Sequence, residues 1–328
     1  MKKAILISML FTTSVMYAQQ PGGTNQYTQQ NFPTATSTAS KVIKLDLKEN
    51  VNNTSNTDYE VEVLKNIVYV ERDDMPLHVH ILYPKGTNGT LPCIVYVPGS
   101  AWMKQNIDMG IPNMTRIAAK GFVVAIVEYR HSAVGKFPSQ VQDAKTAIRF
   151  MRKNAGTYHV DTNNIFVWGD SSGGHTALFV GLTQGNQEID TDIYGEYSAK
   201  VNAVINYFGP AELAKMSDFP SMMNHALPDS PEGILIGGSV PDNPEAARKA
   251  SPVYYVTSNA APVFMAHGDK DMLVPLNQSD LVAEALDKAG VSYEYYCLLG
   301  AGHGSREFWT DELIDKVMAF IKNYTIRN

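Results

Sequence analysis

The chain has 328 residues, of which 44% are apolar and 18% are charged. This composition is typical of a globular protein of one or two domains, with enough apolar residues to bury a large core. The 27 basic and 33 acidic side chains give a net charge of −6 without a stripe of Lys or Arg, which argues against a nucleic-acid partner.

The first eighteen residues have the pattern of a secretory signal peptide. Lys2 and Lys3 precede an apolar stretch from Ala4 to Phe11, and small and polar residues follow as far as Ala18. The apolar stretch is too short to span a bilayer, and no cysteine follows that could carry a lipid. We therefore expect cleavage after Ala18 and a secreted or periplasmic protein without a membrane anchor.

Residues 19–58 are predicted to form a flexible N-terminal segment. The part up to about Ala39 is rich in Gln, Thr, Asn and Ser and has little to bury. The folded domain is expected to occupy residues 59–328. It begins with a hairpin, which is predicted from alternating apolar and polar residues over 60–70 and 77–83.

Nearly continuous apolar runs follow over 91–97 and 122–127, and they predict strands that are buried on both faces. A crossover helix is expected between them over 109–119, and a second helix over 139–154. Strands that alternate with helices in this rhythm indicate a mostly parallel sheet covered by helices on both sides. The fold class is therefore α/β.

The second half of the chain continues this pattern around one long interruption. The remaining elements are predicted to be strands over 165–168, 201–208, 263–267 and 292–299 and helices over 281–289 and 307–324. Between them, residues 210–255 lose all periodicity and contain several methionines and prolines. Loop-rich stretches of this length inside a compact fold are usually functional, so we predict a lid over the site, with a peripheral decoration as the alternative.

A serine stands where a strand changes into a helix. The stretch Gly169-Asp170-Ser171-Ser172-Gly173 follows the apolar run 165–168 and precedes a helix-compatible segment. In a nucleophile elbow the serine is held in a strained turn that lifts its hydroxyl to the carboxyl end of the sheet, and flanking glycines make room for that turn. Ser171 is the predicted nucleophile. The pattern alone is weak evidence, because short Gly and Ser patterns also arise by chance.

The partners that a nucleophilic serine requires follow in the expected order. A histidine must accept the proton of the hydroxyl, and a carboxylate must orient that histidine. In this fold class the order is Ser, acid, His. Asp269 and Asp271 come directly after the strand 263–267, and His303 comes after the strand 292–299. Either aspartate can be the acid on these grounds.

The other histidines are weaker candidates for the base. His225 in the predicted lid is the one rival. His267 is interpreted as the end of a buried strand, and His175 as a packing residue in the first turn of the helix that follows the elbow. The remaining histidines precede the elbow: His78, His80, His131 and His159.

These stretches together resemble a known family. Residues 65–325 are similar to the α/β-hydrolase esterases and lipases of the group that includes hormone-sensitive-lipase-like enzymes and the bacterial acetyl-xylan and feruloyl esterases. The stretches that carry the resemblance are Glu128-Tyr129-Arg130 with Phe137-Pro138, Gln142 to Lys145 with Arg149 to Arg152, Trp168 to His175, Ser251-Pro252-Val253, His267 to Asp271 with Val274-Pro275, and Gly300 to Gly304. The resemblance implies an eight-stranded sheet in which only the second strand is antiparallel, and it selects Asp271 as the acid.

The chain departs from this family at one turn. Where the family has His-Gly-Gly-Gly, this chain has Pro98-Gly99-Ser100-Ala101 ahead of the same tryptophan, Trp102. Because backbone N–H groups stabilise the oxyanion there, we expect the hole to combine the N–H of Ser172 with that of Ser100 or Ala101. Gly99 and Trp102 are the predicted substrate-binding residues.

Other residues are expected to serve the fold. Cys93 and Cys297 each lie in an apolar strand-like run, so we predict two free thiols rather than a disulfide. Asp143, Arg149 and Arg152 belong to the matching stretches and are expected to form an internal ion-pair network.

The sequence thus predicts a secreted serine carboxylesterase that works through an acyl-enzyme, without a metal or an organic cofactor. The expected substrate is a small-acyl ester, acetyl or feruloyl, of a plant polysaccharide or oligosaccharide. The alternatives are a prolyl-type serine peptidase, a general carboxylesterase or lipase for other small esters, and a non-catalytic binding protein. The peptidase is disfavoured because about 310 mature residues leave no room for the extra domain of such enzymes, and the binding protein because all three triad residues are present. The oligomeric state is not predicted.

Overall fold

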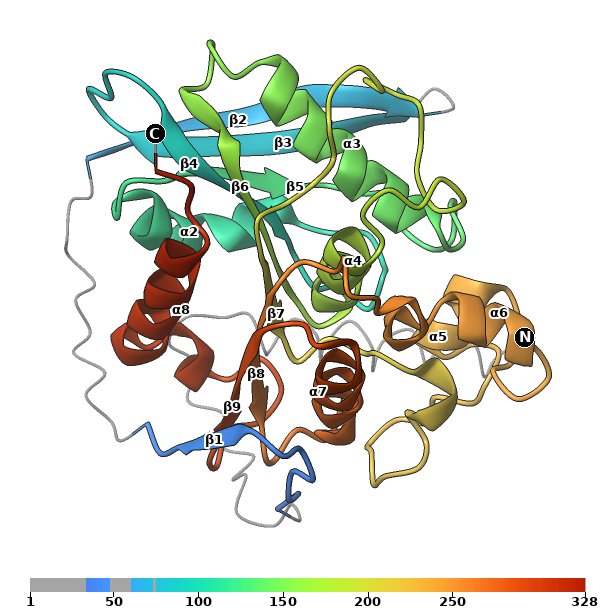
Figure 1. The fold of residues 1–328 in the computed structure, drawn as a ribbon. Coiled ribbons are helices and arrows are strands. Elements are labelled where there is room, and N and C mark those ends of the chain that lie inside the picture. Colours follow the sequence, from blue (N-terminus) through green and yellow to red (C-terminus); the bar gives the residue numbers. More distant parts are fainter. Residues whose placement is uncertain (1–33, 48–59, 73–74, 328) are drawn as a thin grey trace.

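The computed structural model describes residues 34–47, 60–72 and 75–327 (Figure 1). The predicted signal peptide lies outside these residues. Within them, nine strands form one sheet in the order β1-β9-β8-β7-β6-β4-β5-β3-β2. The strands are β1 (Val42–Leu45), β2 (Val61–Arg72), β3 (Met75–Pro84), β4 (Leu91–Val97), β5 (Val123–Val127), β6 (Val160–Asp170), β7 (Val204–Tyr207), β8 (Val263–Gly268) and β9 (Tyr293–Leu298).

The sheet is mostly parallel, as predicted. Strand β3 is antiparallel to both of its neighbours, β2 and β5, and the other neighbouring pairs are parallel. Strands β2 to β9 therefore reproduce the expected eight-stranded arrangement with its second strand antiparallel. The number of strands differs from the prediction, because β1 extends the sheet to nine.

Strand β1 corrects the prediction that residues 19–58 are flexible throughout. Val42 to Leu45 pair in parallel with β9, and the backbone N–H of Thr38 donates to the Asp280 carboxylate at 2.9 Å. Ser40 and Lys41 contact the Asp287 carboxylate. The open edge of β9 offers backbone groups that a short strand can satisfy, and Val42, Ile43 and Leu45 supply the apolar side chains of that strand.

Helices cover both faces of the sheet (Figure 1). One face carries α2 (Ile111–Ala118) and α8 (Asp311–Asn323), and the other carries α3 (Ser139–Lys153), α4 (Ser172–Leu182) and α7 (Asn277–Ala289). Side chains along β4 alternate between the two cores, with Val95 on the side of α3 and α4 and Tyr96 on the side of α2 and α8. In the described part of the chain, no helix is long and apolar enough to cross a membrane.

The stretch 210–255, here called the insertion, is folded rather than irregular. It contains the short helices η3 (Leu213–Lys215), α5 (Pro231–Ile236), α6 (Pro244–Lys249) and η4 (Pro252–Tyr255). Five of its buried apolar residues pack with Trp102 in a third, small core: Leu213, Leu235, Val240, Ala247 and Ala250. Two further short helices, η2 (Ile107–Gly110) and η5 (Arg306–Trp309), precede α2 and α8. The insertion is thus packed onto the turn that follows β4.

The cysteines and the predicted ion-pair residues have structural contacts. Cys93 and Cys297 are free and buried, as predicted, and burial raises the pKa of each thiol to about 12. Asp143 pairs with two arginines, and Arg149 pairs with Asp190 at 2.8 Å. The expected single network is instead two clusters, and Arg152 donates to backbone carbonyls rather than to a carboxylate.

Candidate active site

Ser171 lies between the end of β6 and the start of α4, in the turn expected for a nucleophile. Its backbone has φ 52° and ψ −126°, a conformation that L-residues rarely adopt and that costs about 1–3 kcal/mol. A Cβ at Gly169 would lie 2.1 Å from the carbonyl oxygen of Gly173, and a Cβ at Gly173 would lie 1.9 Å from that of Val97. The two glycines are therefore required for the chain to turn this sharply and for α4 to pack against β4.

The structure brings Ser171, His303 and Asp271 together. His303 Nε2 is 2.9 Å from Ser171 Oγ, and His303 Nδ1 is 2.7 Å from Asp271 Oδ2. Because a carboxylate only accepts, Nδ1 carries the hydrogen, and Nε2 is free to accept the hydrogen of the serine hydroxyl. Asp271 lies in the loop after β8, and His303 in the loop after β9. The carboxyl ends of three parallel strands thus place a hydroxyl, an imidazole and a carboxylate within hydrogen-bonding reach.

Asp271 is held as a carboxylate although its side chain is fully buried. Burial alone would raise its pKa, but the charge of His303 and hydrogen bonds from His267 and His303 outweigh that effect and hold the pKa well below its usual value. The backbone N–H groups of Leu273 and Val274 donate to Oδ1, each at 2.9 Å. The Asp271 carboxyl group is therefore favoured in its ionised form and fixed in orientation.

Asp269 has a different place. Its Oδ1 accepts from the N–H of Gly300 at 2.7 Å, and its backbone oxygen accepts from the N–H of Ala35. Asp269 therefore ties the loop after β8 to the loop after β9 and to the N-terminal segment. Between the two aspartates that the spacing left open, the geometry pairs only Asp271 with His303.

The structure distinguishes the two candidate oxyanion donors of the turn after β4. The N–H of Ser100 donates to Ser172 Oγ at 2.9 Å, so it is already engaged. Ala101 has a left-handed backbone, with φ 54°. Among the hydrogen bonds of the described residues, none uses the N–H of Ala101 or that of Ser172, which begins α4. These two N–H groups flank the elbow and are free to bind an oxyanion.

The two predicted substrate-binding residues, Gly99 and Trp102, are both buried. Trp102 is 1% exposed, and its indole packs in the small core beneath the insertion. Gly99 is also buried, and a Cβ there would lie 2.6 Å from the backbone oxygen of Asp170 and 2.8 Å from Ser171 Cβ. Gly99 therefore allows the turn to approach the elbow. A tryptophan beside a catalytic turn is ambiguous in sequence, because an aromatic residue can serve packing as well as binding.

Several supporting residues were missed by sequence reasoning. The Phe208 ring contacts the His303 ring with centroids 4.6 Å apart, and Phe208 itself has a left-handed backbone. Tyr96 donates to the Asp170 carboxylate at 2.6 Å, and Tyr129 donates to the carbonyl of Pro98 at 2.9 Å. Only Tyr129 lay in a stretch that the resemblance had marked. The other two are apolar-pattern residues whose contacts depend on the tertiary fold.

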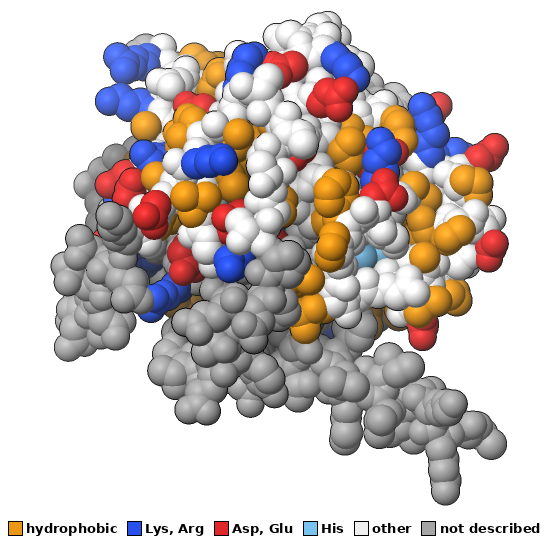
Figure 2. Space-filling model, turned by 90° about the horizontal axis from the view of Figure 1, so that it is seen from below, with side chains coloured by type: hydrophobic (Ala, Val, Ile, Leu, Met, Phe, Trp, Pro, Cys, Tyr) orange, Lys and Arg blue, Asp and Glu red, His pale blue; other side chains and the backbone are white. Residues whose placement is uncertain are grey.

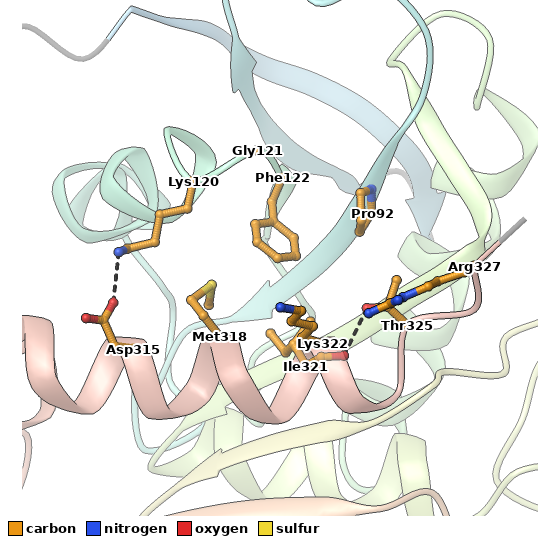
Figure 3. A pocket seen from close by; sticks show the side chains of 10 residues that line it. All are labelled: Pro92, Lys120, Gly121, Phe122, Asp315, Met318, Ile321, Lys322, Thr325 and Arg327. Carbon is orange, nitrogen blue, oxygen red and sulfur yellow. Dashed lines mark hydrogen bonds and ion pairs between the residues drawn. The ribbon is translucent and has the colours of Figure 1, made fainter.

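A pocket of about 420 Å³ lies elsewhere, near the start of β4 and between α8 and the residues that follow α2 (Figure 3). Phe122 and Met318 line it, and Lys120 and Asp315 form an ion pair at its side, 3.0 Å apart. Since β4 begins here, this is the amino end of the sheet, opposite to the elbow. In the part of the chain that the structure describes, no group of three or more His, Cys, Asp or Glu side chains is arranged to hold a metal.

Residues 79–286 match the model of the BD-FAE family, which is more than half of the chain. The chain belongs to the BD-FAE family. The matched range contains Ser171 and Asp271, while His303 lies beyond its end. This finding confirms the resemblance and the α/β-hydrolase fold that the sequence indicated.

Known proteins similar to this BD-FAE chain include esterases. Esterase LipC of Mycobacterium tuberculosis is 31% identical over 215 residues, which are 65% of this chain and 53% of that protein. A truncated carbohydrate esterase from gut microbiota is 26% identical with a TM-score of 0.72, covering 82% of this chain and 98% of that one. A bifunctional GH43-CE protein of Bacteroides eggerthii is 30% identical with a TM-score of 0.73, and the match covers 80% of this chain and 35% of that one. The chain spans about half the length of the curated relatives that it matches.

Proposed function

We propose that this BD-FAE protein is a serine carboxylesterase. The observation that carries the proposal is the His303 imidazole, which bridges Ser171 Oγ at 2.9 Å and the Asp271 carboxylate at 2.7 Å. The names of its relatives support an ester as the substrate.

The geometry supports a two-step reaction. Ser171 Oγ forms a bond to the ester carbonyl carbon while its proton passes to His303 Nε2, and the alcohol then leaves with that proton. Water attacks the acyl-enzyme, gives its proton to His303, and the acid leaves as Ser171 regains its hydrogen. The N–H groups of Ala101 and Ser172 would stabilise the oxyanion of each step, and loss of one such donor is worth about 3 kcal/mol.

The proposed substrate is an acetyl ester, or a feruloyl ester, of a plant polysaccharide or oligosaccharide. One similar structure, at 26% identity, is a carbohydrate esterase from gut microbiota. The face seen in Figure 2 shows hydrophobic side chains interspersed with basic and acidic ones. The signal-peptide pattern supports a secreted or periplasmic location, where such glycans are met.

A substrate panel tests this proposal. Purified protein should release acetate from acetylated xylan and nitrophenol from short nitrophenyl esters, and a fluorophosphonate probe should label it at Ser171. Cleavage of proline-linked amides in preference to esters would favour the peptidase. Hydrolysis of nitrophenyl esters without hydrolysis of acetylated or feruloylated glycans would indicate a general carboxylesterase. Absence of both labelling and turnover would leave a binding protein.

A further inference from the structure

His175 lies one helical turn beyond Ser171, and the mechanism above gives it no role. It is 1% exposed, and its backbone N–H donates to the carbonyl of Ser171 at 3.0 Å. Its ring nitrogens contact two parts of the chain that are distant in sequence: the indole of Trp102 and the carbonyl of Ala250. The ring therefore joins the helix after the nucleophile, the turn after β4 and the insertion.

The partners of the ring fix its protonation. The Ala250 carbonyl only accepts, so Nε2, at 2.8 Å, carries a hydrogen. The indole N–H of Trp102 only donates, so Nδ1, at 3.3 Å, is an acceptor. Burial lowers the pKa of His175 to about 4, which agrees with a neutral ring. Both contacts are satisfied only by this one tautomer.

Trp102 belongs to the turn that carries the second proposed oxyanion donor. Ala101 and Trp102 both have left-handed backbones, with φ 54° and 53°. Each costs roughly 1 kcal/mol or more for a residue with a side chain, so two in succession persist only where their surroundings hold them. The buried indole provides one such hold, and the N–H of Ser132 provides another by donating to the Trp102 carbonyl at 2.8 Å.

We propose that His175 is a positioning residue, which fixes the N–H of Ala101 through the Trp102 indole and couples this turn to the insertion through Ala250. The inference rests on the proposed esterase function and deepens it. Without an acceptor at His175 Nδ1, the indole N–H would be buried among apolar side chains, at a cost that the turn can avoid by shifting. A shifted turn would move the Ala101 N–H away from the oxyanion.

Three substitutions separate the two ring contacts. His175→Asn places an amide oxygen near Nδ1 and can still accept from Trp102. His175→Gln places its amide nearer Nε2 and can donate to the Ala250 carbonyl, but it leaves the indole without an acceptor. Trp102→Phe keeps an aromatic ring and removes the N–H. The readouts are kcat and KM for nitrophenyl acetate and the rate of inactivation by a fluorophosphonate, whose phosphoryl oxygen occupies the oxyanion site.

We expect His175→Gln and Trp102→Phe to lower kcat and the inactivation rate by about tenfold or more, part of the effect of losing an oxyanion donor. KM should change by less than about twofold, and His175→Asn should keep most of the activity. The double variant His175→Gln/Trp102→Phe should be no slower than the slower single variant, because both break one link. Thermal unfolding checks that each variant is folded.

Several results would overturn the inference. The first is a wild-type rate of inactivation by the probe in both Trp102→Phe and His175→Gln. The second is a loss of kcat in the double variant that equals the product of the two single losses. The third is an equal loss of kcat in His175→Asn and His175→Gln. If His175→Gln does not fold, the two single variants Trp102→Phe and His175→Asn still test the inference, because only the first removes the indole contact. If the probe labels wild-type protein but the protein does not hydrolyse glycan esters, only the proposed substrate is contradicted. Wild-type protein that neither reacts with the probe nor turns over an ester would contradict both proposals.

Discussion

In the part of the chain that the structure describes, serine, histidine and carboxylate side chains come together more than once, and only the Ser171 group has the surroundings of a catalytic site. The first is Ser171, His303 and Asp271. The second lies in the insertion, where His225 Nε2 is 3.0 Å from Ser221 Oγ and Nδ1 is 3.0 Å from Glu232 Oε1. By distance alone the two groups are nearly equivalent, so the comparison shows which features beyond distance make a triad.

The serines differ most. Ser171 is held with φ 52° at the start of a helix, beside backbone N–H groups that no other described residue engages. Ser221 is not in such a turn, and its hydroxyl also donates to the carbonyl of Met272 at 3.0 Å. A hydroxyl that holds a neighbouring loop is not free to attack an ester. Strain and unused donors, rather than contact with a histidine, therefore mark the nucleophile.

The histidines and carboxylates differ as well. The His303 side chain is 14% exposed, whereas that of His225 is 2% exposed. Although His225 Nδ1 and Glu232 Oε1 are 3.0 Å apart, they lack hydrogen-bond geometry, and Glu232 Oε2 has no partner among the described residues. The second group joins the insertion to the residue that follows Asp271. We therefore expect this second group to serve structure rather than catalysis.

The largest difference is expected between the two serines. Ser171→Ala should lower kcat on nitrophenyl acetate on the order of a millionfold, because the attacking oxygen is lost while the oxyanion hole remains. Ser221→Ala, the matched control, should keep kcat within a few-fold. Steady-state kinetics with a fluorophosphonate titration of active sites measures both. Retention of a tenth of the activity by Ser171→Ala would contradict the assignment of the nucleophile.

The carboxylates should follow in size of effect. Asp271→Asn should lower kcat about ten-thousandfold, since the amide leaves His303 in the wrong tautomer. Glu232→Gln and Asp269→Asn have no contact with His303 and should cost far less. The three variants are compared by kcat under one set of conditions. Equal losses in Asp271→Asn and Asp269→Asn would mean that the acid is wrongly chosen.

The histidines should differ in how activity depends on pH. An imidazolium cannot accept the proton of Ser171, so kcat/KM should rise with pH along one ionisation and then level off. This rising limb should vanish with the activity in His303→Ala and persist in His225→Ala. A profile of kcat/KM against pH for each variant measures this. Loss of the limb in His225→Ala alone would place the base in the insertion.

Sequence reasoning reached the parts of this protein that local pattern determines. Apolar runs predicted β4, β5 and β8, because strands buried on both faces are apolar at nearly every position. Chain order and the positions of residues at strand ends indicated Ser171 and His303. The family resemblance was needed to prefer Asp271, since two aspartates stand in one short turn and only the folded loop shows which faces the histidine.

The missed features depend on contacts between distant segments. Strand β1 exists because the edge of β9 accepts it, and a run of four residues does not indicate which edge it will join. Trp102 is buried because the insertion folds over it, and the N–H of Ser100 is engaged because Ser172 carries a hydroxyl in reach. A pattern in one segment cannot report what another segment contributes to it.

The smallest expected effect concerns stability in acid, and it separates Asp271 from Asp269 without any substrate. The charged and hydrogen-bonding partners of Asp271 hold its folded pKa below the value of about 3.9 of an unfolded aspartate. Its contribution to the free energy of unfolding is therefore complete well above pH 4 and is lost as the pH falls toward its folded pKa. Asp271→Asn should be less stable than wild type at pH 7 and should approach it in acid.

Asp269 provides the control, because its shift has the opposite sign. Burial raises the pKa of Asp269, so the folded state binds its proton more tightly than the unfolded state does. The contribution of Asp269 to the free energy of unfolding therefore becomes less favourable as the pH rises through about 4. Over that interval the stability of Asp269→Asn should increase relative to that of wild type. Urea unfolding of the three proteins between pH 3 and pH 7 measures both trends. If the free energy of unfolding of the two variants depended on pH in the same way, the charged form of Asp271 would be no better stabilised in the folded state than that of Asp269.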